Sequence, residues 1–116
     1  MNTTKQNEIL ATLEQADRTD LVRTAQSIID RFHTANIELV SALNSLRRDV
    51  DATIGEVRYG LHTTCARTMV RDAEQIVVLA LTRDLISNEA IRFVHAVRVD
   101  LGVEISAVSL LAPGRD

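Results

Sequence analysis

One apolar stripe dominates residues 21–61, which read LVRTAQSIIDRFHTANIELVSALNSLRRDVDATIGEVRYGL. Its positions are Leu21, Ala25, Ile28, Phe32, Asn36, Leu39, Leu43, Leu46, Val50, Ile54, Val57 and Leu61. They recur every three or four residues, about 3.6 on average, which is the period of one face of a straight α-helix. Such a helix extends roughly 60 Å, whereas a compact domain of this size has a radius of gyration of about 13 Å. The stripe therefore predicts a long helix, about residues 20–59, that either breaks or needs a partner to cover it.

The composition is that of an ordinary structured chain with an aliphatic core. Hydrophobic residues make up 46%, charged residues 25% and aromatic residues 3% of the 116 residues. A chain of this length forms one domain. The low aromatic content suits closely packed helices and argues against a deep ligand pocket.

Charge and hydropathy indicate where the protein acts. The formal net charge is −3, whereas a free-standing nucleic-acid binder usually carries a basic excess that neutralises phosphates. Cys65 is the only cysteine, so a disulfide within the chain is excluded. The longest apolar run, residues 76–81, is far shorter than the roughly 20 residues of a membrane span, and the first residues lack the apolar core of a secretory signal. We expect a cytoplasmic protein, bacterial or phage-encoded, without a membrane partner.

The remaining sequence also indicates helices. A capping box of Thr3 and Gln6 begins a short helix, about residues 3–16. Poor helix formers gather at residues 59–64 and predict a turn before a third helix, about 64–86. Capping residues then predict C-terminal helices over 88–111. We expect an all-α fold of four to five helices, with an antiparallel helical hairpin built on the long central helix and a helical-bundle homo-oligomer.

Residues 97–105 carry two overlapping patterns. Apolar and polar residues alternate there, as in a strand, while Val97, Leu101 and Ile105 keep helical spacing. A single strand would find no partner within a helical chain, so we favour two helices bent near Gly102. The alternative is a strand that pairs with its copy in a dimer.

The C-terminal part resembles a segment of a known family. LISNEAI (residues 85–91), DLGV (residues 100–103) and the apolar residues that follow are similar to the later helices of MerR-type regulators and their chaperone-modulator relatives. The resemblance implies two helices joined at the Leu-Gly-Val sequence. The helix-turn-helix that reads DNA in that family has no counterpart in this sequence, so DNA binding is not implied.

Regular spacing on two helices predicts where the chain meets a copy of itself. Alanine recurs every seventh residue at Ala66, Ala73 and Ala80, which lets two helix backbones approach closely. The predicted oligomer interface consists of Leu39, Leu43, Leu46, Val50, Ile54 and Val57, faced by Ala66, Met69, Ala73, Ile76 and Ala80. A homodimer is the expected state, because two-fold assemblies are the commonest closed symmetry.

Motifs for catalysis or cofactor binding are absent from the sequence. Two pairs of residues have the spacing of metal ligands on one helix face: His62 with Cys65, and Asp30 with His33. Zinc needs three or four protein ligands, and neither pair has further ligands nearby in sequence. There is no phosphate-binding loop and no Ser-His-Asp pattern. We predict no catalytic residues, no metal and no cofactor.

The preferred functional interpretation is a non-enzymatic adaptor or assembly protein that acts through self-association and protein–protein interaction. The alternative is a transcriptional or nucleic-acid-associated regulator that binds as a dimer through Arg47, Arg48, Arg67 and Arg71. Salt-dependent retention on DNA would distinguish the two interpretations.

Overall fold

The computed structural model describes residues 4–58 and 66–112, apart from the side chains of Thr4 and Ala66. These residues form four helices and no strand: α1 (Thr4–Gln15), α2 (Thr19–Arg58), α3 (Ala66–Leu101) and α4 (Ala107–Leu111). The prediction of an all-α fold is confirmed for this part of the chain. The turn predicted at residues 59–64 lies outside the described residues.

The chain divides into two compact units, and both long helices contribute to each of them. Unit 1 combines Met1–Thr34 with Arg83–Asp116, and unit 2 is the continuous segment Ala35–Thr82. Unit 1 therefore joins two segments that are distant in sequence. Unit 2 contains the second part of α2 and the first part of α3.

α2 is one continuous helix of 40 residues, whose bounds differ by one residue at each end from the expected 20–59. Its sequence contains no proline, so every residue can donate a backbone hydrogen bond. The negative charge of Asp20 in the first turn and the positive charge of Arg58 in the last turn are the charges that the helix dipole stabilises at those ends.

α3 is also continuous, so the expected start of a new helix near residue 88 is wrong. Ser87 and Asn88 favour helix N-termini by local hydrogen bonding, yet both lie inside α3. Ile86 and Ala90 are buried on either side of them and continue the apolar spacing of the helix. Burial of that face outweighs the capping preference of the two polar residues.

Gly102 ends α3. Its φ of 66° is the left-handed conformation that glycine adopts without steric cost, and its N–H donates to the Arg98 carbonyl at 2.9 Å. Ser106 then caps α4 by accepting a hydrogen bond from the Ser109 N–H at 3.1 Å. Two helices therefore flank Gly102, and the strand alternative for residues 97–105 is wrong.

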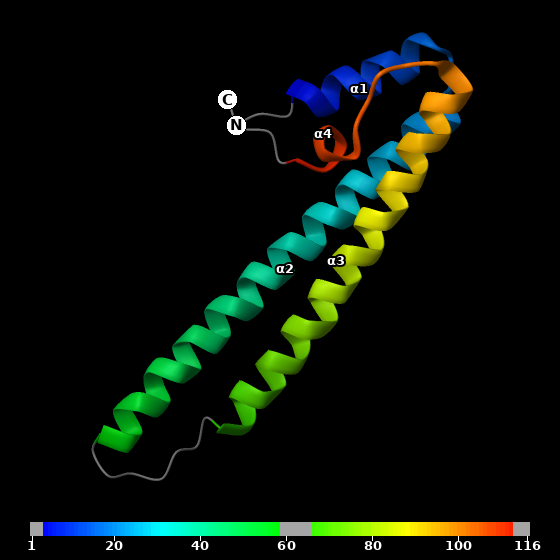
Figure 1. Cartoon of the computed structure of the whole chain (residues 1–116). Coiled ribbons are helices and arrows are strands. Elements are labelled where there is room, and N and C mark those ends of the chain that lie inside the picture. Colours follow the sequence, from blue (N-terminus) through cyan, green and yellow to red (C-terminus); the bar gives the residue numbers. More distant parts are fainter. Residues whose placement is uncertain (1–3, 59–65, 113–116) are drawn as a thin grey trace. The chain divides into compact units, whose positions relative to one another are not determined.

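The core of unit 1 joins the first and last helices of the described chain. α1 and α4 lie side by side (Figure 1). The fully buried side chains include Leu13, Ile28, Val97 and Leu110. Gln6, itself buried, donates through Nε2 to the carbonyls of Leu110 at 2.8 Å and Ala112 at 2.9 Å. One α1 side chain thus satisfies two carbonyls at the end of α4 that have no partner within that helix.

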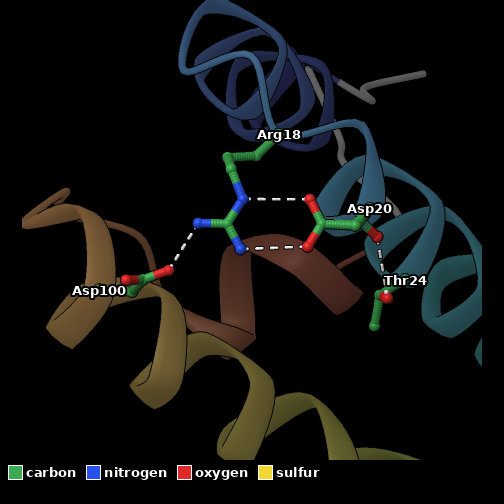
Figure 2. A network of polar contacts seen from close by, with 4 residues as sticks. All are labelled: Arg18, Asp20, Thr24 and Asp100. Carbon is green, nitrogen blue, oxygen red and sulfur yellow. Dashed lines mark hydrogen bonds and ion pairs between the residues drawn. The ribbon is translucent and has the colours of Figure 1, made fainter.

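A polar network joins the start of α2 to the end of α3 in unit 1 (Figure 2). The Arg18 guanidinium donates to both Asp20 carboxylate oxygens at 3.1 Å and to Asp100 at 2.7 Å. The Thr24 hydroxyl donates to the Asp20 backbone carbonyl at 3.0 Å. The bonds from Arg18 hold the pKa of the Asp20 carboxyl below its ordinary value. Because these groups are exposed to solvent, the network orients the helix ends more than it stabilises the fold.

Candidate interaction surface

In unit 2, α2 and α3 lie side by side (Figure 1). The contacts, in order along α2, are a cluster of Leu39, Ala42, Ile76 and Leu79, a hydrogen bond between Ser45 and Asp72, and a contact between Thr53 and Met69. Higher residue numbers on α2 therefore meet lower residue numbers on α3.

The contact follows one line of residues on each helix, which we call the internal seam. Its members are Leu39, Ala42, Leu46, Asp49 and Thr53 on α2, and Met69, Asp72, Ile76 and Leu79 on α3. All are buried or half-buried. They follow one another alternately by three and four residues, the heptad spacing of two helices that pack along their length.

Two carboxyl groups face each other within the internal seam. Asp72 is only 6% exposed, and its Oδ2 accepts a hydrogen bond from the Ser45 hydroxyl at 3.0 Å. As long as both carboxyl groups accept and neither donates, the buried Oδ2 of Asp49 has no hydrogen-bond partner. A hydrogen bond with Asp72 is the main cause that raises the pKa of Asp49; burial and repulsion by Asp72 add to it, while Arg48 and Arg71 oppose it. A proton shared between the two carboxyls would supply the missing partner.

A second line on each helix remains uncovered, and we call it the outer seam. On α2 it consists of Val40, Leu43, Arg47, Val50, Ile54 and Val57, and on α3 of Val70, Ala73, Val77 and Ala80. The five aliphatic side chains on α2 are 39–62% exposed, and the two valines on α3 are 57–59% exposed. Ala73 is exposed and Ala80 half-buried. The outer seam has the same heptad spacing as the internal seam.

Both halves of the outer seam face the same side of the helix pair. Every outer position except Val57 follows an internal position by one residue, as Leu43 follows Ala42 and Val77 follows Ile76, and so lies about 100° further round its helix. Along their contact, the residue numbers of the two helices increase in opposite directions. A rotation of about 100° about each helix axis, in the direction in which its own chain turns, therefore brings both outer lines to the same side of the pair. The result is a face of unit 2 that is apolar except for Arg47, with a hollow at one end lined by Thr53, Ile54, Val57 and Arg58.

The residues predicted for the oligomer interface divide between the two seams. Leu39, Leu46, Met69 and Ile76 belong to the internal seam, whereas Leu43, Val50, Ile54, Val57, Ala73 and Ala80 belong to the outer seam. The side chain of Ala66 lies outside the described residues. The predicted line runs between the two seams. A step of four residues from Leu39 reaches Leu43 in the outer seam, whereas a step of three residues reaches Ala42 in the internal seam.

Three apolar members of the outer seam were missing from the predicted interface. Val40, Val70 and Val77 are all more than half exposed. The signal that would have found them is a second heptad line displaced by one residue from the first. A single stripe with a period of 3.6 residues runs between these two lines.

The four arginines of the nucleic-acid alternative are all exposed. Arg47 lies in the outer seam, whereas Arg48 and Arg71 act electrostatically on Asp49. None of the four, Arg67 included, forms an ion pair with another residue in the described part of the chain. The structure therefore places two of these cations beside an acid pair.

Residues 4–58 and 66–112 contain no group of three or more His, Cys, Asp or Glu side chains that could hold a metal ion. The predicted pair His62 and Cys65 lies outside these ranges. No helix among the described residues is long and apolar enough to cross a membrane.

None of the protein-family models, curated proteins or solved structures compared with the chain matches it significantly.

Proposed function

We propose that the chain is a non-enzymatic assembly protein that associates with a second copy of itself and serves as an adaptor for another protein. In this proposal residues 35–82 form an antiparallel helical hairpin, and two hairpins combine into a four-helix bundle. The outer seam is the observation that carries the proposal. A helix with two adjacent heptad seams contacts two neighbours, as each helix of a four-helix bundle does.

The exposed apolar surface offers a gross gain in free energy comparable to the cost of association. Full burial of a valine, leucine or isoleucine side chain contributes about 1.5–3 kcal/mol, so covering one that is half exposed contributes about 1 kcal/mol. Seven such side chains lie in the outer seam of each copy. The gross gain is therefore roughly 14 kcal/mol per dimer, against an association cost of about 4–15 kcal/mol. Association of this kind depends on most of the outer seam being covered at once.

Sedimentation velocity over a range of protein concentrations tests the proposal. We expect the wild-type chain to sediment as a dimer that dissociates on dilution, and the double variant Leu43→Asp, Ile54→Asp to remain a folded monomer. Ile37→Asp is the matched control, because Ile37 is 56% exposed but lies outside both seams. A wild-type chain that stays a folded monomer at every concentration would show that the proposal is wrong.

The adaptor role is assigned to apolar residues that lie outside both seams. Val78 is 60% exposed and Leu81 59% exposed on α3 in unit 2. They are one helical turn apart, as expected for a small contact with another protein. We expect the variant Val78→Asp, Leu81→Asp to keep the dimer and to lose a partner protein that the wild-type chain retains in a pull-down from its host. Retention of the same partner by the variant would contradict this assignment.

A further inference from the structure

We infer that the second copy is related to the first by a two-fold axis parallel to the helices, so that α2 of each copy lies over α3 of the other. The inference rests on the proposed self-association and specifies its geometry. A two-fold axis perpendicular to the helices would instead place α2 over α2 and α3 over α3. The side chains of the outer seam distinguish these two arrangements by their size and by their charge.

The two halves of the outer seam differ in the size of their side chains. The α2 half carries five large aliphatic side chains, whereas the α3 half alternates valine with Ala73 and Ala80. Helices approach more closely where the side chains between them are small. An axis parallel to the helices pairs a large line with a small line in both contacts. The perpendicular axis would pair two large lines in one contact and two lines with alanine gaps in the other, which is harder to pack at uniform density.

Two charged residues of opposite sign lie in or beside the outer seam. Arg47 is the only charged residue in the outer seam, and Glu74 borders the seam directly after Ala73. Neither forms an ion pair with a described residue of its own chain. In the heptad repeat of the outer seam, Arg47 occupies a position in the contact itself and Glu74 the position that flanks it. Residues at such flanking positions commonly form ion pairs between two helices.

The parallel axis brings these two charges together. It leaves each residue at its own height along the bundle, so the contacts within unit 2 also give the heights across the dimer. Ser45 meets Asp72 and Thr53 meets Met69, which places Arg47 and Glu74 within about one helical turn of each other in height. An arginine side chain spans that distance. The Arg47 stem then covers Ala73 of the second copy, and its guanidinium reaches Glu74 beside it.

A charge exchange between two tagged full-length chains tests this geometry. One chain carries Arg47→Glu and the other Glu74→Arg. In the proposed dimer each variant alone has two like-charged contacts, whereas the mixed dimer has two opposite-charged contacts. We expect each variant to self-associate about tenfold more weakly than the mixed pair. Native mass spectrometry of the mixture should then show about nine-tenths mixed dimer, where random pairing would give about one half.

The outcomes separate this inference from the proposed function. A wild-type dimer with random pairing of the two charge variants overturns the inference and leaves self-association standing. A wild-type monomer overturns both. Circular dichroism of each variant confirms that the exposed substitutions leave the helices formed.

Disulfide trapping provides a second, independent measurement in a Cys65→Ser background. Leu43→Cys in one chain and Val77→Cys in the other lie in the same layer of the proposed dimer, so we expect a mixed disulfide on oxidation. Val78→Cys is the control, because it has nearly the same exposure as Val77 but lies outside the seam. Disulfides of Leu43→Cys with itself, or equal trapping by Val78→Cys, would refute the arrangement.

Discussion

Two neighbouring valines offer a sharp test of where the chain associates. Val77 is 57% exposed and Val78 60% exposed, both lie inside α3, and only Val77 belongs to the outer seam. Replacing either with aspartate makes the same change in helix propensity and net charge. A difference between Val77→Asp and Val78→Asp in dimer affinity therefore reports the contact and not the fold.

The expected difference is large. The Val77→Asp variant forfeits about 1 kcal/mol of apolar burial in each copy and leaves a partly dehydrated carboxylate without a partner, at a further cost of about 1–3 kcal/mol. Two-fold symmetry counts each effect twice. The sum is about 4–8 kcal/mol per dimer, so we expect the dissociation constant to rise by at least roughly a thousandfold. For Val78→Asp we expect a change within about twofold, because surface substitutions away from contacts have small effects.

Sedimentation equilibrium at several loading concentrations measures both dissociation constants against the wild type, and circular dichroism checks the helix content of each variant. Equal weakening by the two substitutions would mean that charge or helix propensity, and not the outer seam, controls association. Dissociation by Val78→Asp alone would move the interface to the other side of α3.

Three further predictions concern stability and charge. The raised pKa of Asp49 means that the folded state holds a proton more tightly than the unfolded chain, so this group's contribution to stability declines as pH rises above about 4. The variant Asp49→Asn should therefore raise the urea midpoint above that of the wild type by more at pH 7 than at pH 4. An equal gain at both pH values would refute the shared proton. Gly102→Ala should lower the free energy of unfolding by about 1–2 kcal/mol, since its φ is positive, whereas Gly55→Ala inside α2 should raise it by about 1 kcal/mol; urea titrations measure both, and the same sign for the two would contradict the argument. The chain should pass through an immobilised-DNA column at low salt, because its net charge is negative; retention that salt reverses would favour the nucleic-acid alternative.

Local signals in the sequence predicted most of the helix positions, but not which side chains are covered within the chain. The apolar period predicted the length of α2, and Gly102 marked the end of α3 because its backbone conformation is a local property. The capping residues Ser87 and Asn88 misled because their preference is small beside the burial of the apolar face that runs past them.

Which part of the long stripe is covered within the chain depends on the partner helix. Leu39 is buried and Leu43 is exposed, although the two are one turn apart on the same stripe. The acid pair was equally hidden from the sequence, since Asp49 and Asp72 meet only when α2 packs on α3. Long-range pairing, and not helix formation, is what the amino-acid pattern left open.

The hydrogen bonds from Gln6 to the end of α4 have a consequence for the order in which the protein forms during translation. Unit 1 needs residues from both α1 and α4, so its core cannot close until the ribosome has released the α4 segment. Unit 2 is continuous in sequence and can form earlier, since domains generally fold as they emerge. The apolar face of unit 2 is then available to a second nascent chain while the first is still being synthesised.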